Sequence, residues 1–292
     1  MTGRRGFTLV ELLIALVMMV LVAGGIYSLM VTTHRVSRKQ TEISNLQGNL
    51  RGGLNLVQSE LQEIYTDAAV GVSDIYNMTA ASLDYDAMRG IGESCGLTLG
   101  GGAVQIRQDG YSGRPPDGAG RDRLLLFQDR DTLTSSDDVW LDFPITGVNP
   151  NGVCTVGTPG PSWDLVVPTL LADHLIDAVS GNPLLFAPGP VRTVERMELG
   201  LVNDAGKDWL GIRSSSGGEA TLIPVIGPLT ASGLEFLYFD GSDAPTLAPS
   251  AVKTIVVTLR GVSAEQVTTG LGSIVGTPED SVVVRVQLRN SR

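Results

Sequence analysis

The first 31 residues constrain this chain most, because a short basic leader is followed there by a long apolar run. The leader ends at Gly6, the run begins at Phe7, and Glu11 is the one charged residue within it. Residues 12–31 carry no charge, and a helix of that length spans the roughly 30 Å hydrocarbon core of a bilayer. The run therefore predicts a membrane-spanning helix.

The apolar run differs from a cleaved secretory signal, whose apolar core is only about 7–15 residues long and precedes a small-x-small cleavage site. Here the run is longer, and its far end at residues 27–32 lacks such a site. We therefore expect the segment to remain in the mature protein. Basic residues flank the run on both sides and leave its orientation open; they are Arg4, Arg5, Arg35, Arg38 and Lys39.

Glu11 requires an explanation, because an ionised carboxylate inside a bilayer costs on the order of a few kcal/mol. One interpretation is an interfacial carboxylate without a role, since Glu11 lies about one helical turn from Phe7. The other is that Glu11 pairs with a cation from another molecule, such as an α-amino group at Phe7 exposed by cleavage after Gly6. Two unit charges about 4 Å apart attract by about 4 kcal/mol at an effective dielectric near 20, which offsets the burial.

Residues 6–13, GFTLVELL, resemble the processing site of type IV prepilins and type II secretion pseudopilins. The resemblance implies that prepilin peptidase cleaves between Gly6 and Phe7 and that Phe7 is N-methylated. It implies that Glu11 pairs with the N-terminus of a neighbouring subunit during filament assembly. It also implies a single-pass protein of the bacterial inner membrane with its head in the periplasm, which later joins a pilus or pseudopilus.

A stripe of apolar residues at spacings of three and four continues the helical pattern beyond the membrane. Its members are Ile43, Leu46, Leu50, Leu54, Val57, Leu61 and Ile64. We expect residues 1–6 to form the leader, residues 7–66 one long helix with its membrane span at about 7–31, and residues 67–292 a periplasmic or extracellular head. The second half of the helix would pack on this head, as in the pilin fold.

The head is predicted to be rich in β-strands, because 36 glycines and 15 prolines in 292 residues are typical of a turn-rich domain. We expect loops and mixed structure over residues 70–122. Alternating apolar patterns then predict strands of a mainly antiparallel sheet, so the fold class is α+β. These strands are expected at 123–127, 138–143, 163–167, 184–186, 191–202, 209–213, 221–226, 232–240, 252–260 and 281–290.

The predicted C-terminal strands indicate which kind of pilin or pseudopilin the chain resembles. The pattern of residues 233–240, the looser pattern of residues 255–259 and the Leu-Arg-Asn ending of the last strand are similar to PilW-type minor pilins and J-type minor pseudopilins. This similarity implies a structural minor subunit of a priming or tip complex, with the major pilin, other minor subunits and the inner-membrane assembly platform as partners. The alternative is a filament-borne adhesin or ligand-binding minor pilin, for DNA or a surface.

Two sequence features distinguish this chain from major pilins and from tip subunits of the K type. Many major pilins carry a proline within the membrane helix, whereas the first proline here is Pro115. Tip subunits of the K type typically lack the glutamate that this chain retains as Glu11. The formal net charge of −10 also disfavours a nucleic-acid binder that acts through a broad basic surface.

Two cysteines, Cys95 and Cys154, fit an oxidising compartment, where they either form a disulfide or remain two unrelated buried thiols.

Residues 92–96 match the Gly-x-Ser-x-Gly pattern of a nucleophile elbow around Ser94. That motif needs a preceding strand, a following helix and a histidine base, for which the chain offers His34 and His174. Because the flanking residues predict neither element, we expect no enzyme and no catalytic residue.

The sequence implies no cofactor, and Ca²⁺ is the one ion for which it offers candidates. Ca²⁺ requires several oxygen ligands that converge at about 2.3–2.6 Å. The candidates, which cluster in sequence, are Asp129, Asp131, Asp240 and Asp243. The alternative, which we favour, is that they are solvated carboxylates in loops.

Overall fold

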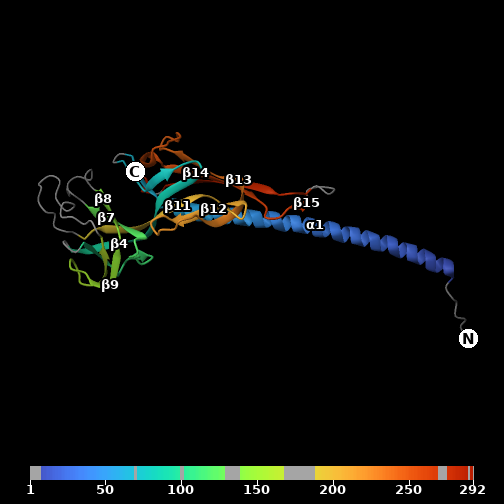
Figure 1. Cartoon of the computed structure of the whole chain (residues 1–292), viewed down its shortest axis with the longest axis horizontal. Coiled ribbons are helices and arrows are strands. Elements are labelled where there is room, and N and C mark those ends of the chain that lie inside the picture. The colour runs from blue at the N-terminus through green and yellow to red at the C-terminus, as the bar shows by residue number, and fades with distance from the viewer. Residues whose placement is uncertain are drawn as a thin grey trace, which may run out of the picture.

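The structure, a computed structural model, describes residues 8–68, 71–98, 102–128, 139–167, 188–268, 275–288 and 290–291. One long helix, α1 (Leu9–Leu61), has 53 residues and is about 80 Å long at 1.5 Å per residue. Its second half lies along a β-rich head and its first half extends away from it (Figure 1). This arrangement confirms the predicted α+β class, a long apolar helix on a mainly antiparallel sheet.

The described part of the head contains both short and long strands. Those in its N-terminal part are β1 (Tyr65–Asp67), β2 (Val72–Ser73), β3 (Ile75–Met78), β4 (Ser82–Thr98), β5 (Ala103–Arg107), β6 (Ser112–Gly113), β7 (Asp122–Gln128), β8 (Val139–Pro144), β9 (Gly147–Val153) and β10 (Pro161–Val166). Those in its C-terminal part are β11 (Pro190–Asp204), β12 (Lys207–Ser214), β13 (Ile223–Phe239), β14 (Thr254–Val262), β15 (Val267–Thr268), β16 (Val275–Gly276), β17 (Glu279–Gln287) and β18 (Asn290–Ser291). A 3₁₀ turn, η2 (Pro249–Ala251), precedes β14.

One sheet of thirteen strands dominates the head, in the order β17-β14-β13-β12-β11-β4-β5-β10-β9. Four further strands belong to this sheet but lie outside that order. Strands β3 and β6 pair with β4, β7 pairs with β11, and β8 pairs with β7. Every pairing in this sheet is antiparallel. Two small sheets, β18-β1-β2 and the β15–β16 hairpin, complete the described fold.

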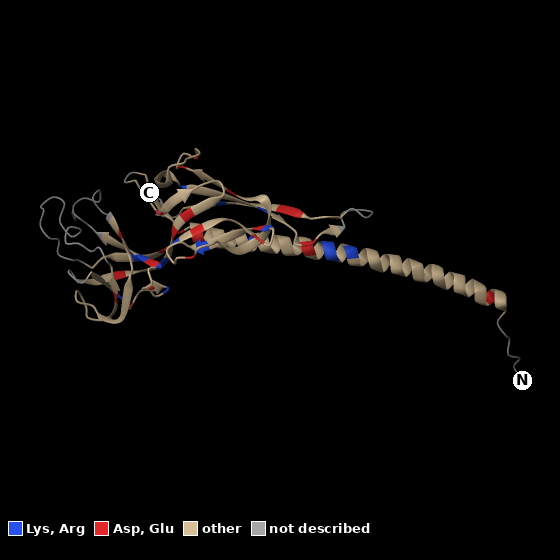
Figure 2. Ribbon diagram, viewed as in Figure 1, with Lys and Arg blue, Asp and Glu red and all other residues tan. Residues whose placement is uncertain are grey.

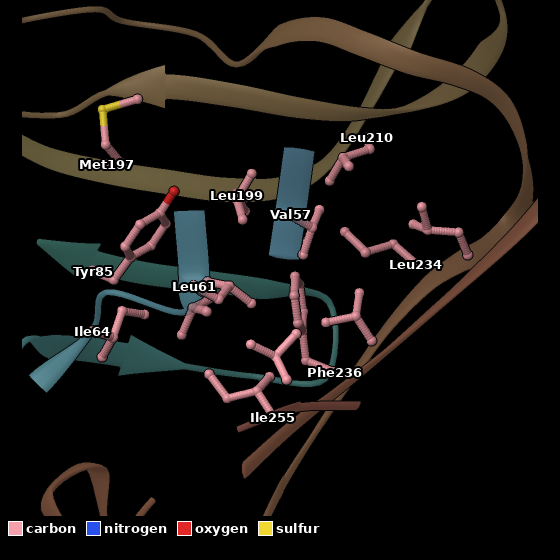
Figure 3. Close-up of a cluster of buried hydrophobic side chains, with 14 of the residues drawn as sticks. Val57, Leu61, Ile64, Tyr85, Met197, Leu199, Leu210, Leu234, Phe236 and Ile255 are labelled. Atoms are coloured by element: carbon pink, nitrogen blue, oxygen red, sulfur yellow. The ribbon is translucent and has the colours of Figure 1, made fainter. Parts of the chain in front are cut away.

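The long strands β4 and β11 connect two hydrophobic cores. In the first core, α1 packs against β11 to β14 and β17, and we call this part of the head the proximal lobe. Figure 3 shows Val57 and Leu61 of α1 among side chains of the sheet, including Leu199 and Phe236. The second core, the distal lobe, is formed mainly by β5, β7, β8, β10 and the start of β11. The distal lobe lies beyond the end of α1 (Figure 1).

The predicted apolar stripe of α1 faces the sheet. Leu46, Leu50, Val57 and Leu61 are buried, whereas Leu54 is partly buried against the same core. Burying one such side chain contributes roughly 1.5–3 kcal/mol, so the stripe anchors the second half of the helix to the head.

The helix ends at Leu61, five residues before the predicted end at residue 66. Tyr65 begins strand β1, and its backbone N–H donates to a carboxylate oxygen of Asp74 at 2.8 Å. The next residue, Thr66, pairs with Ser73 of β2 and Ser291 of β18. These partners, of which Ser291 is distant in sequence, replace the hydrogen bonds that a further helical turn would have formed.

The expectation of loops and mixed structure over residues 70–122 is wrong for β4, a strand of 17 residues that contains Gly90, Gly92 and Gly96. Gly90 and Gly92 lie under the ring of Tyr111, and a Cβ added at Gly90 would lie 1.9 Å from the Tyr111 hydroxyl. A Cβ at Gly96 would lie 1.8 Å from Oε1 of Gln105. The glycines therefore permit close packing within a strand and do not mark turns.

Most of the other predicted strands are present. The expected strands at 221–226 and 232–240 form one strand, β13, whose pairing with β14 shifts register between Leu229 and Leu234. The expected strand at 184–186 lies outside the described residues.

Adjacent glycines of α1 provide a test of the helix–sheet contact. A Cβ at Gly53 would lie 2.7 Å from Cγ2 of Ile226, whereas a Cβ at Gly52 meets nothing within 4 Å. We expect Gly52→Ala to stabilise the chain by about 0.5–1 kcal/mol through helix propensity. Gly53→Ala should instead destabilise it by about 1 kcal/mol, because overpacking outweighs the same gain. Urea unfolding of the full chain in detergent measures both changes, and equal stabilisation by both variants would contradict the packing.

Candidate assembly interface

The first half of α1 has apolar side chains exposed around its circumference, from Leu9 to Val36. None of its most apolar 18-residue window, with mean hydropathy 2.7, is buried in the protein, and it is long and apolar enough to cross a membrane. Figure 2 shows an acidic residue at the N-terminal end of α1, then an uncharged stretch, then basic residues close to the head. A helix that is apolar all round requires apolar surroundings, which a bilayer or other apolar helices provide.

Glu11 forms a capping box with Thr8 at the start of α1. Its Oε2 accepts hydrogen bonds from the backbone N–H and the hydroxyl of Thr8, both at 3.0 Å, and Thr8 Oγ1 accepts from the Glu11 N–H at 3.3 Å. The sequence analysis missed this role, although Thr-x-x-Glu before an apolar run is its signature. Glu11 remains exposed, and among the described residues its Oε1 forms no hydrogen bond.

The predicted cleavage site between Gly6 and Phe7 lies outside the described residues. The first described residue is Thr8, whose N–H is held by Glu11. The structure therefore places the Glu11 carboxylate against Thr8, the residue that follows Phe7 in the sequence, and leaves one of its oxygens available to another molecule.

A polar network joins the end of α1 to the two long strands of the head. Glu60 of α1 accepts hydrogen bonds from Arg89 and from the hydroxyl of the buried Tyr85, the latter at 3.2 Å. Arg89 Nε also donates to Glu195 of β11 at 2.8 Å, and Arg121 pairs with the same carboxylate. Burial alone would raise the pKa of Glu195, but hydrogen bonds from its neighbours hold that pKa below its ordinary value. The network fixes the direction in which α1 leaves the head.

Asp74 is a second polar contact at the end of α1. Its carboxylate accepts from the Tyr65 N–H, and its own N–H donates to the Tyr65 carbonyl at 2.9 Å. Burial raises the pKa of Asp74 from 3.8 to about 7, the Tyr65 bond opposes this rise, and the Asp86 charge adds to it. Asp74 is therefore partly protonated near neutral pH.

The raised pKa of Asp74 predicts a pH-dependent stability. The unfolded carboxyl ionises above about pH 4 while the folded one stays protonated up to about pH 7, so this group destabilises the fold as pH rises between those values. Asp74→Asn keeps an oxygen acceptor for Tyr65 but cannot ionise. Between pH 5 and pH 7, we therefore expect the unfolding free energy of wild type to fall by about 2 kcal/mol more than that of Asp74→Asn.

Urea unfolding at both pH values measures this difference. Asp109→Asn, at an exposed turn, is the matched control and should leave the pH dependence unchanged. Parallel pH profiles for wild type and Asp74→Asn would contradict the assignment.

Cys95 and Cys154, which the sequence left either paired or separate, form a disulfide. It connects β4 to the residue after β9, across the distal lobe. The backbone N–H groups of Thr155 and Val156 donate to the Cys95 carbonyl at 3.1 and 2.9 Å, so hydrogen bonds reinforce the same junction.

Loss of the disulfide should destabilise the distal lobe selectively. The two cysteines are 59 residues apart, and the chain-entropy model assigns about 4 kcal/mol to such a cross-link. We expect the double substitution Cys95→Ser, Cys154→Ser to speed amide hydrogen exchange in β5 and β10 and to leave β14 unchanged. Reductant should reproduce the effect in wild type and add nothing to the double variant. Equal exchange changes in both lobes would show that the cross-link stabilises the whole head.

Ser94 does not lie on a nucleophile elbow. It is buried within β4, its hydroxyl donates to the Gly189 carbonyl at 3.1 Å, and the Gly189 N–H donates back to it at 3.0 Å. His34 is exposed on α1, and His174 lies outside the described residues. The Gly-x-Ser-x-Gly pattern is thus part of a strand.

The two described calcium candidates are already engaged within the chain. Asp240 Oδ1 accepts hydrogen bonds from Ser242 and from the Ala244 N–H, and Asp243 pairs with Arg285. Asp129 and Asp131 lie outside the described residues. Within the described ranges, no group of three or more His, Cys, Asp or Glu side chains could hold a metal ion.

Comparison with known families identifies a prokaryotic N-terminal methylation motif at residues 1–27. The match supports a type IV pilin-like protein, and it implies processing by prepilin peptidase and assembly with other pilins. Proteins with this motif are typically structural and not enzymatic. Searches of curated proteins and of solved structures gave no match for the chain.

Proposed function

We propose that this chain is a structural, non-enzymatic minor subunit of a bacterial type IV filament system. One observation carries the proposal: an exposed apolar half-helix begins at the methylation motif, with Glu11 at its end. Before assembly, α1 anchors the chain in the inner membrane with the head in the periplasm. During assembly, the same apolar surface leaves the lipid and packs among the helices of other subunits.

Glu11 supplies the specific contact in this mechanism. Lipid chains are as apolar as the side chains of α1, so burial of apolar surface does not by itself drive one membrane helix onto another. A pair between the Glu11 carboxylate and the cleaved, methylated N-terminus of a neighbouring subunit provides that attraction, about 4 kcal/mol at 4 Å and an effective dielectric near 20. The Thr8 hydrogen bonds hold the carboxylate at the end of the helix, where such a partner would meet it.

The head supports assignment to a large minor subunit. It combines the proximal lobe, which carries the C-terminal strands that resemble PilW-type and J-type subunits, with a separate distal lobe. In this proposal the chain joins other minor subunits in a complex that primes or caps a pilus or a type II secretion pseudopilus. The major pilin and the inner-membrane assembly platform are the remaining partners.

Substitutions at Glu11 and Thr8 separate docking from helix capping. Glu11→Gln removes the charge, whereas Thr8→Ala removes the cap and keeps the charge; loss of a cap costs about 1 kcal/mol. We expect Glu11→Ala and Glu11→Gln to lower incorporation into sheared filaments at least tenfold, and Thr8→Ala to lower it less than threefold. Immunoblots of the filament and membrane fractions measure this. Normal incorporation of Glu11→Ala would refute the mechanism. Equal losses of incorporation for all three variants would show that Glu11 acts only as part of the helix cap.

Gly6→Ala tests the processing step independently. We expect it to leave the six-residue leader attached, which is visible as an unshifted mass in intact-protein mass spectrometry. Circular dichroism should show that the head remains folded. Cleavage at the normal rate would contradict the assigned site.

A further inference from the structure

Strand β17 forms one edge of the thirteen-stranded sheet. It pairs with β14 through nine consecutive residue pairs without a register shift, from Val262 with Glu279 to Thr254 with Gln287. Among the described residues, no strand pairs with its other side. An edge strand presents a row of unpaired N–H and C=O groups, which can pair with a strand of another chain.

The opposite edge of the same sheet is protected against such pairing, whereas β17 is not. Strand β9, at that edge, contains Pro150, and its pairing with β10 is irregular. Proteins commonly block edges with proline, lysine or a bulge. Strand β17 has no proline, lysine or bulge, and its charges, Glu279, Asp280 and Arg285, lie on either side of a central stretch in which Val283 is 61% exposed.

The side of β17 that faces the core is also incompletely covered. Val282 and Val284 pack against the proximal core but stay partly exposed. Their cross-strand partners in β14, Leu259 and Val257, are fully buried. The difference arises because β14 has a strand on each side and β17 has one. A further strand beside β17 would complete the burial of both valines.

We propose that the outer edge of β17 binds an extended strand of a neighbouring filament subunit, which adds one strand to the sheet. This inference rests on the proposed function, because the partner is a subunit that packs against α1. Strand β17 lies beside α1: the Gln47 side chain donates to the Asp280 carboxylate at 3.1 Å. A subunit that packs along α1 as far as Gln47 would therefore lie next to the start of β17.

An antiparallel pair of β17 strands from two copies of this chain does not satisfy the geometry. Strand β17 begins beside the β15–β16 hairpin, which projects along α1, and ends toward the C-terminus (Figure 1). Antiparallel pairing would invert one copy, yet both copies of α1 must enter the same membrane in one direction. The partner strand is therefore not a second β17 in antiparallel pairing.

The charges of β17 specify the partner strand further. Glu279 and Asp280 begin the strand beside Gln47 of α1, Val283 follows, and Arg285 lies toward the other end. Opposite charges across a strand pair stabilise it by roughly 0.2–1 kcal/mol, and apolar pairs contribute similarly. A matching strand carries an apolar residue opposite Val283 and a basic residue at its membrane-proximal end.

Two exposed valines provide a matched test in the full chain. Val283 on β17 and Val153 on β9 are 61% and 60% exposed and both lie on edge strands. We expect Val283→Asp to lower incorporation into sheared filaments at least fivefold and Val153→Asp to leave it within twofold of wild type. Membrane levels and detergent unfolding report whether each variant folds. Equal incorporation of the two variants would overturn the proposal.

Hydrogen exchange gives a second readout that needs no substitution. Amides of β17 should exchange at least tenfold more slowly in assembled filaments than in the detergent-solubilised subunit, while β9 amides stay unchanged. Unchanged exchange at β17 in filaments that contain the subunit would refute the edge contact alone. Absence of wild-type chain from the filaments would instead refute the proposed function, and the edge contact with it.

Discussion

The burial of one apolar stripe of α1 against the sheet is the contact on which the rest of the structure depends. Leu50, Val57 and Leu61 are almost wholly inaccessible to water, whereas the apolar side chains of the same helix between Leu9 and Met30 are exposed. Because α1 is uninterrupted from Leu9 to Leu61, this contact fixes the head relative to the exposed half. In the proposed function, this rigidity would orient the head while the helix moves from lipid into a filament.

Polar contacts at the end of α1 extend that constraint into the rest of the head. Glu60 reaches Arg89 of β4, and Arg89 reaches Glu195 of β11. These two strands continue into the distal lobe, where Val191 of β11 belongs to the core and Leu97 of β4 packs against it. The distal lobe is therefore coupled to the helix through two strands and a charge network, although none of its core residues lies on α1.

The proposed assembly uses one kind of contact inside the membrane and another outside it, because different interactions are weak in the two environments. Within the membrane, apolar packing gives little specificity between helices, so a charge at Glu11 provides it. Outside the membrane, surface ion pairs are weak, so the backbone edge of β17 and the valines beside it provide the contact between heads. Both contacts lie along α1, one at its N-terminal end and the other beside Gln47.

The sequence by itself determined the membrane run, the motif around Gly6 and Glu11, the helical stripe and most strands of the C-terminal half. Each is a local pattern, in which charge, hydropathy and spacing within some ten to thirty residues decide the outcome. Only the tertiary structure decided that Gly90 and Gly92 lie in a strand, since the ring of Tyr111 reaches them from a later segment. It also decided the end of α1, the Cys95–Cys154 pairing and the exposed edge at β17. These features depend on which distant segments meet, and the same local residues are compatible with other partners.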